Sequence, residues 1–185
     1  MGDPGGNLWK GAAAGLVGGL VASWTMNRFQ DVWLALSERK DASPGSRSSD
    51  REKEVEEARG SDGDNNEQDD TTVRAASALS EGIFGHKLTK DEKKIAGPAV
   101  HYALGTGVGG LYGAVAEVAP QVTTSAGLPF GTAFWLVVDE TAVPALGLSK
   151  PPTQYPVSTH VYALASHLVY GLTAELVRRS LRRAF

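Results

Sequence analysis

Apolar residues gather in four stretches of the chain, each about twenty residues long, at 8–26, 96–118, 125–147 and 155–177. A helix of about twenty residues, rising 1.5 Å per residue, crosses roughly 30 Å of hydrocarbon. The pattern therefore predicts an all-α integral membrane bundle of four transmembrane helices, the first within 8–30 and the other three within 95–178. Because glycine, alanine and several ionisable residues dilute these stretches, a soluble bundle of buried helices is the alternative.

Between the first and second stretches the chain becomes polar. Residues 37–72 carry 12 acidic and 6 basic side chains and hardly an aliphatic one, which predicts an acidic disordered linker. In residues 73–94 the apolar side chains return at intervals of three to five, as in an amphipathic segment. Such a segment could lie on a membrane surface or pack as a short soluble helix.

A basic tail at 178–185 follows the last apolar stretch directly and contains four arginines. An even number of spans places both termini on one side of the membrane, and the positive-inside rule makes that side cytoplasmic. We therefore expect a multi-pass protein with both termini in the cytoplasm.

The second and fourth apolar stretches share the pattern Tyr-Gly-x-x-Ala-Glu, at 112–117 and 170–175. The first and third share a looser Gly-to-Trp spacing. Because each pair of stretches starts on the same side, we predict two repeated helical hairpins related by a pseudo-two-fold axis along the membrane normal.

Glycine recurs at every fourth position in the first two stretches. Removing side chains from one face lets two helix backbones approach closely, which matters in lipid because apolar burial provides little drive there. We predict helix-packing seams, which could join helices of one chain, copies in a homo-oligomer or the chain and a larger membrane complex. The glycines are Gly11, Gly15 and Gly19 in the first stretch and Gly105, Gly109 and Gly113 in the second.

Ionisable residues inside the predicted spans are unusual, since one charge at mid-bilayer costs about 3 kcal/mol. The helical rise brings five of them to the outer half of the bundle, where we expect a proton-titrating cluster. Glu117 and Glu175 belong to the opposite end, where they would meet Arg178, Arg179 or solvent. The five residues of the expected cluster are His101, Asp139, Glu140, His160 and His167.

Such a cluster admits three interpretations: a proton relay or pH sensor, a divalent-metal site, or a buried hydrogen-bonded network that fixes helix register. Metal binding is the least favoured, because no His-x-x-His or Glu-x-x-His ligand pair is present. The sequence therefore predicts no metal.

Composition and motifs give no indication of catalysis. The chain has no cysteine, which excludes a disulfide scaffold, a thiolate zinc site and a cysteine nucleophile. A Gly-x-Gly-x-x-Gly pattern at 105–110 lies inside an apolar helical stretch with no preceding strand, so it does not indicate a dinucleotide site. The net charge of -3 gives no reason to expect nucleic acid. We expect no enzyme activity and no cofactor.

Four phrases occur together in the chain and carry a resemblance. They are Ala-Ser-Trp-Thr-Met-Asn-Arg-Phe-Gln at 22–30, Ala-Gly-Pro-Ala-Val-His-Tyr-Ala-Leu-Gly at 96–105, Pro-Phe-Gly-Thr-Ala-x-Trp-Leu-Val-Val-Asp-Glu at 129–140 and His-x-x-Ala-Leu-x-Ser-His-x-x-Tyr-Gly at 160–171. In combination they resemble the YagU-like family of small bacterial inner-membrane proteins. The resemblance implies a bacterial inner-membrane location and a link to acid tolerance, and it supplies no catalytic residues.

Three hypotheses of function follow. The first is a membrane protein with a pH-related role, in proton sensing, conduction or acid tolerance, through the five-residue cluster. The second is a structural or accessory subunit that packs through its glycine seams. The third is a small-solute transporter that uses the two hairpins as halves. The lipid bilayer is the partner common to all three.

Overall fold

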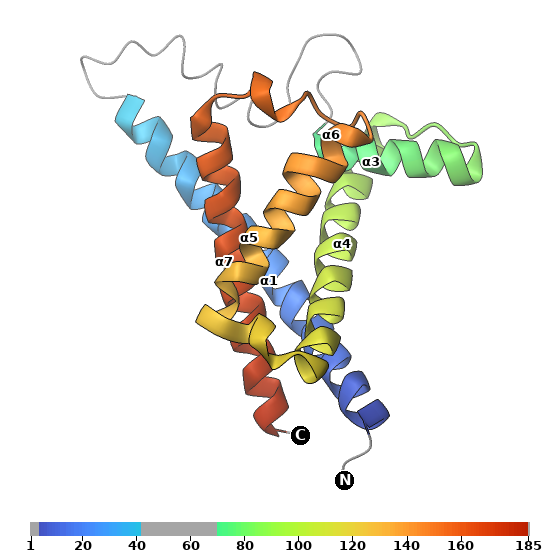
Figure 1. The fold of residues 1–185 in the computed structure, drawn as a ribbon. Helices are drawn as coiled ribbons and strands as arrows, with labels where there is room; N and C mark the ends of the chain where they lie inside the picture. Colours follow the sequence, from blue (N-terminus) through green and yellow to red (C-terminus); the bar gives the residue numbers. More distant parts are fainter. Residues whose placement is uncertain (1–3, 42–69, 185) are drawn as a thin grey trace. The chain divides into compact units, whose positions relative to one another are not determined.

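The computed structural model describes residues 4–41 and 70–184, and every regular element in them is helical (Figure 1). The predicted all-α class is therefore confirmed for the described residues. Most of the predicted acidic linker, 42–69, lies outside them. The elements are α1 (Pro4–Asp41), α3 (Thr71–Leu79), η1 (Ser80–Phe84), α4 (Lys90–Val118), η2 (Pro120–Gly127), α5 (Leu128–Val137), η3 (Val138–Ala142), α6 (Val143–Ala145), η4 (Pro152–Gln154) and α7 (Val157–Ala184).

These helices differ in extent from the predicted spans. Helix α1 continues to Asp41, into the start of the acidic stretch, and α7 continues through the predicted basic tail to Ala184. No helix within 4–41 or 70–184 combines the length and the apolar character that a crossing of the bilayer requires.

The chain divides into two compact units. Unit 1 takes its described residues from 4–31, 102–137 and 163–184, and unit 2 takes them from 32–41, 70–101 and 138–162. Helices α1, α4 and α7 therefore contribute residues to both units.

Unit 1 is a bundle in which α1, α4, α5 and α7 pack against one another (Figure 1). The start of α1 and the end of α7 lie at the same end of this bundle. A Cβ atom at Gly18 of α1 would lie 2.8 Å from the Ala174 carbonyl oxygen of α7. Close approach of helix backbones thus holds the unit together.

Small, polar and aromatic residues fill the interior of unit 1, whereas many large aliphatic residues face outward. The buried positions include Ala14, Ala22, Ser23, Ser166, His167 and Glu175. The exposed positions include Leu16, Leu20, Trp24, Leu111, Leu136 and Leu176. This distribution inverts that of most water-soluble domains, in which large aliphatic residues occupy the core.

The third apolar stretch forms three consecutive helical segments instead of one regular helix. The chain widens into the π-helical turn η3 just before Pro144, which has no N–H to donate to the Glu140 carbonyl. The stretch ends at Gly147, whose φ of 71° is in the left-handed region. There Gly147 N donates to Pro144 O and Leu148 N donates to Val143 O, both at 3.0 Å, as in a Schellman motif.

A capping box starts α4. The Thr89 backbone N–H donates to Glu92 Oε2 at 2.7 Å, and Glu92 N donates to Thr89 Oγ1 at 3.3 Å. The His86 ring also contacts the Glu92 carboxylate at 3.2 Å. These contacts fix the loop between η1 and α4.

The cap predicts an acid-sensitive helix start. Hydrogen bonds from the backbone and side chain of Thr89 lower the pKa of Glu92 from its ordinary 4.5 to about 2. A lowered folded-state pKa contributes stability that is present above the ordinary value and is lost as the pH falls towards 2. We expect carbon-13 NMR of the Glu92 carboxyl, in the full-length protein in micelles, to give a midpoint near 2. Thr89→Ala should raise this midpoint, and a wild-type midpoint near 4.5 would contradict the cap.

Candidate functional site

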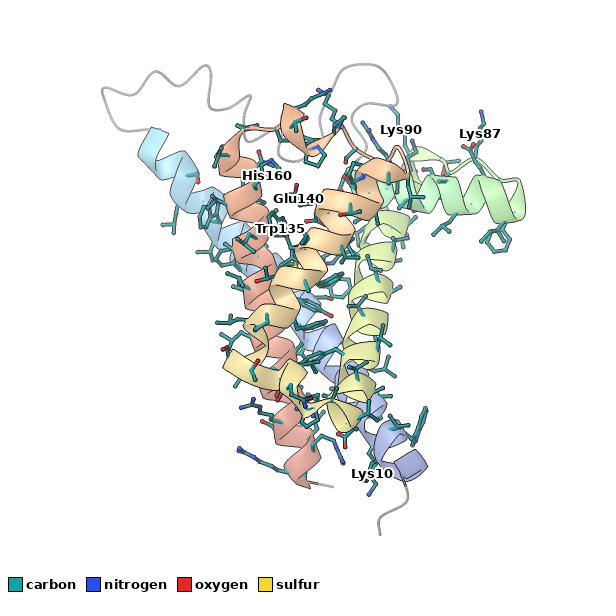
Figure 2. The ribbon with its side chains drawn as sticks, viewed as in Figure 1. Lys10, Lys87, Lys90, Trp135, Glu140 and His160 are labelled. Carbon is teal, nitrogen blue, oxygen red and sulfur yellow. The ribbon has the colours of Figure 1, made fainter. Side chains whose placement is uncertain are left out.

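A histidine and a carboxylate form a close pair in unit 2. His160, in the first turn of α7, lies with Nδ1 2.6 Å from Glu140 Oε1 in η3 (Figure 2). Both side chains are largely shielded from solvent, at 27% exposed for His160 and 16% for Glu140. The other ring nitrogen, Nε2, lies 3.0 Å from the Pro152 carbonyl oxygen.

Both ring nitrogens of His160 are in contact with oxygen atoms. A neutral imidazole has one N–H donor, whereas both His160 nitrogens face oxygen atoms that accept hydrogen bonds. Only the imidazolium ion donates to both of them while Glu140 is ionised. The ring therefore connects α7 to η3 through Nδ1 and to η4 through Nε2.

The other residues of the expected cluster are divided between the two units. His101 and Asp139 are half-buried in unit 2, on α4 and η3. His167 belongs to unit 1, where it is buried, lies edge-on to Phe134 at 5.0 Å between ring centroids, and contacts the Ala163 carbonyl oxygen through Nδ1 at 2.9 Å. Glu140 and His160 therefore contact each other in unit 2, whereas His167 belongs to the packing of unit 1.

The described residues include no group of three or more His, Asp or Glu side chains placed to hold a metal ion.

The two glycine stripes of unit 1 face each other across α1 and α4. A Cβ atom at Gly109 would lie 2.5 Å from Gly19 Cα and 2.6 Å from the Gly15 carbonyl oxygen. Gly105 approaches Ser23 in a similar way, and Gly113 approaches Gly11 and Gly15. The stripes are thus occupied within one chain.

The repeated sequence pattern has a counterpart in this packing. Gly113 in the first copy packs against Gly15 of α1. Its equivalent in the second copy, Gly171, packs against Gly131 of α5, since a Cβ atom added at Gly171 would lie 2.9 Å from Gly131 Cα. The neighbouring Gly127 has a φ of 85°, which favours glycine, and its added Cβ atom would overlap the Gly171 carbonyl oxygen. Both copies of the Tyr-Gly-x-x-Ala-Glu pattern therefore use their glycine for close helix contact.

The glutamates of the repeat hold a network of arginines at the end of unit 1. Glu175 is completely buried and accepts hydrogen bonds from Tyr112 at 2.8 Å, from Arg178 at 2.7 and 2.9 Å, and from Arg179. Glu117 accepts two hydrogen bonds from Arg182, at 2.7 and 2.9 Å, which raise the pKa of that guanidinium. The basic tail is therefore partly neutralised by carboxylates of α4 and α7.

Sequence reasoning missed the part that the repeat tyrosines play here. Tyr112 of the first copy donates to Glu175 of the second, and Tyr170 donates to the Gly105 carbonyl oxygen at 2.5 Å. The available signal was the Tyr-Gly-x-x-Ala-Glu pattern itself. It names the residues, whereas the exchange of partners between the copies depends on how the helices pack.

Fold and contacts together define a class of protein: a glycine-packed helical bundle with an apolar exterior, a buried ion network and a shielded His–Glu pair. The model of a family described as a protein of unknown function (DUF1440) matches residues 81–176. Because this match covers more than half of the chain, the protein belongs to that family. Neither the curated proteins nor the solved structures contain a significant match to the chain.

Proposed function

We propose that this chain is a small multi-pass protein of the bacterial inner membrane that senses or conducts protons through the Glu140–His160 pair. The observation that carries the pH-related role is the contact of both His160 ring nitrogens with oxygen acceptors. Histidine is the side chain whose charge changes most readily near neutral pH. A change of charge at this pair would alter the hydrogen bonds between α7, η3 and η4.

The membrane setting is supported by the exterior of unit 1. Leucine, valine and tryptophan side chains are exposed on α1, α4, α5 and α7, while glycine, alanine and polar groups face inward. Lipid would cover the outward side chains, and the inward polar groups would satisfy one another. The inward glycines and polar residues lower the average hydropathy of each helix without making its outer face polar. The resemblance to the YagU-like inner-membrane proteins, with their link to acid tolerance, supports the same proposal.

The test compares proton entry and conformational response in one preparation. The purified protein is reconstituted in liposomes that contain a pH-sensitive dye, and an external acid step is applied to the wild type and to His160→Gln. If the protein conducts protons, we expect the wild type to acidify the interior faster than protein-free liposomes. If it senses pH, we expect its tryptophan fluorescence to change with pH, because the rings of Trp33 and Tyr162 lie 5.9 Å apart between centroids and Tyr162 follows His160 by two residues. His160→Gln should abolish that response.

The chain supplies a matched control in its second His–Glu pair. His86 and Glu92 lie 3.2 Å apart but are about half exposed, so His86→Gln removes an equivalent contact in a solvated setting. This variant should behave like the wild type in both measurements. If His160→Gln changes neither proton entry nor the fluorescence titration, the proposal is wrong.

A small-solute transporter is the second candidate, and one observation favours it. The equivalent packing of Gly113 and Gly171 gives the two hairpins a similar internal construction, as in transporters built from repeated halves. An accessory role through the glycine seams is less favoured, because α1 and α4 already occupy them.

A further inference from the structure

The start of α3 is fixed to the rest of unit 2, but none of the described residues covers the apolar side chains at its other end. Asp70 Oδ1 accepts a hydrogen bond from Thr72 N at 3.0 Å and caps the helix. Val73 then packs against Gly97 of α4, where an added Cβ atom would lie 2.5 Å from Val73 Cγ2, and Ala76 is buried. The first half of α3 therefore sets the direction in which its second half projects.

Beyond Ala76 the apolar side chains are exposed. Leu79, Ile83 and Phe84 are 52%, 67% and 78% exposed, and all three lie at the end of α3 or in η1. Ile83 follows Leu79 by four residues, close to one turn of helix, so these two residues lie on the same side of the segment. An apolar face of this kind needs a partner of low polarity.

Lysines follow this apolar end directly. Residues 86–94 contain four lysines and two acidic residues, and Lys87 and Lys90 are exposed at the same end of unit 2 (Figure 2). The loop that carries Lys87 is held in place, because Ser80 Oγ donates to the His86 carbonyl oxygen at 2.7 Å and Glu92 contacts the His86 ring. The loop that follows η1 is thus held in place by Ser80 and Glu92.

We propose that Leu79, Ile83, Phe84 and the lysines at 87 and 90 form an interfacial anchor that binds the surface of an anionic phospholipid membrane. The inference rests on the proposed membrane function and assigns a lipid contact to unit 2. The apolar side chains enter the boundary between headgroups and acyl chains, and the lysines bind the lipid phosphates. Charge complementarity selects this occupant, since an apolar protein partner would not require the adjacent lysines.

The absence of cysteine in the chain makes a site-specific test direct. Phe84→Cys in the full chain is labelled with an environment-sensitive fluorophore and placed in nanodiscs of phosphatidylglycerol and phosphatidylethanolamine. We expect quenching by lipids that carry a nitroxide near the headgroup. The matched control is Gly82→Cys, which is exposed in the same turn, has open space around an added Cβ atom and projects roughly half a turn away from position 84. Its label should respond to a water-soluble quencher instead.

Charge dependence is tested with the label at position 84. Lys87→Gln and Lys90→Gln should each lower the lipid-bound fraction by about fivefold, and nanodiscs of phosphatidylcholine alone should have a similar effect. Lipid quenching that does not change in these variants would overturn the assignment of an anionic surface. If neither the lipid-borne nor the water-soluble quencher reaches the label at 84, a protein covers this position. That result would also overturn the proposed lipid anchor.

A label at Leu111→Cys separates this proposal from the proposed function. Leu111 is an exposed residue of α4 in unit 1, so a membrane-embedded unit 1 predicts quenching there by nitroxides deep in the acyl chains. If acyl-chain nitroxides quench the label at 111 but only the water-soluble quencher reaches the label at 84, the proposed anchor is wrong and the membrane setting of unit 1 stands. If only the water-soluble quencher reaches the labels at both positions, the proposed anchor and the membrane setting are both wrong.

Discussion

Gly109→Leu is expected to prevent unit 1 from folding. The leucine side chain would have to occupy the space of Gly19 Cα and the Gly15 carbonyl oxygen, which are backbone atoms and cannot turn aside as a flexible side chain would. Overpacking of a tight contact costs about 1–3 kcal/mol, and a clash between two helix backbones lies at or above the upper end of that range. The measurement is the yield of monodisperse protein in detergent, followed by thermal unfolding.

Gly107→Leu is the matched control for this prediction. It introduces the same side chain into the same helix two residues away, where an added Cβ atom meets nothing within 4 Å. We expect its effect on the free energy of unfolding to stay within about 0.5 kcal/mol. Equal losses in the two variants would mean that the seam is not the cause.

Glu175→Ala is expected to destabilise the protein by about 3–5 kcal/mol, the range for breaking a buried ion pair from one side. The substitution leaves Arg178, which is 8% exposed, without its buried carboxylate, and it removes the acceptor for the Tyr112 hydroxyl. Chemical unfolding of the full chain in micelles, monitored by circular dichroism, measures the loss.

Two further variants show where that loss of stability comes from. Asp31→Ala breaks the exposed pair between Arg28 and Asp31 on α1, and it should change the free energy of unfolding by less than about 1 kcal/mol. Adding Arg178→Met to Glu175→Ala removes the stranded charge and should recover part of the stability. Arg178 Nη1 also lies 3.7 Å from Glu117 Oε1, so it keeps one weaker partner. A double variant as unstable as the sum of its single variants would show that the cost does not come from the buried charge of Arg178.

The helical class could be predicted because the apolar stretches are long and contain few strand-forming patterns. Glycine at every fourth position also identifies which face of α1 or α4 can approach another backbone. It cannot identify the partner, because a seam within one chain and a seam between two copies require the same small residues. Only the packing shows that Gly15 and Gly109 meet within one chain.

The site could be predicted only in part, for a geometric reason. The helical rise orders residues by depth along an axis, which places Glu140 and His160 at comparable depth, but it does not fix the direction of each side chain around that axis. His167 has a suitable depth, yet its Nδ1 contacts the carbonyl oxygen of Ala163 in the preceding turn. Sequence distance along a helix therefore cannot separate a member of a cluster from a packing residue.

The position of Glu175 in the sequence predicts only some of its contacts. The sequence places it near the end of its stretch, beside the arginines, which fits the hydrogen bonds it accepts from Arg178. Its complete burial and its hydrogen bond from Tyr112, which is 63 residues away on α4, are not evident from that position. The capping box at Thr89 and Glu92 is the opposite case, since its Thr-x-x-Glu spacing is local and could have been found in the sequence.

The seam between α1 and α4 has a consequence for biosynthesis. Ribosomes deliver the chain from its N-terminus, at roughly 5–20 residues per second, so the α1 half of the seam emerges several seconds before the α4 half is complete. During this interval the backbone groove of Gly15 and Gly19 has no matching helix from its own chain. The contact between α1 and α4 therefore cannot form until α4 has been made, and nascent α1 depends on its surroundings until then.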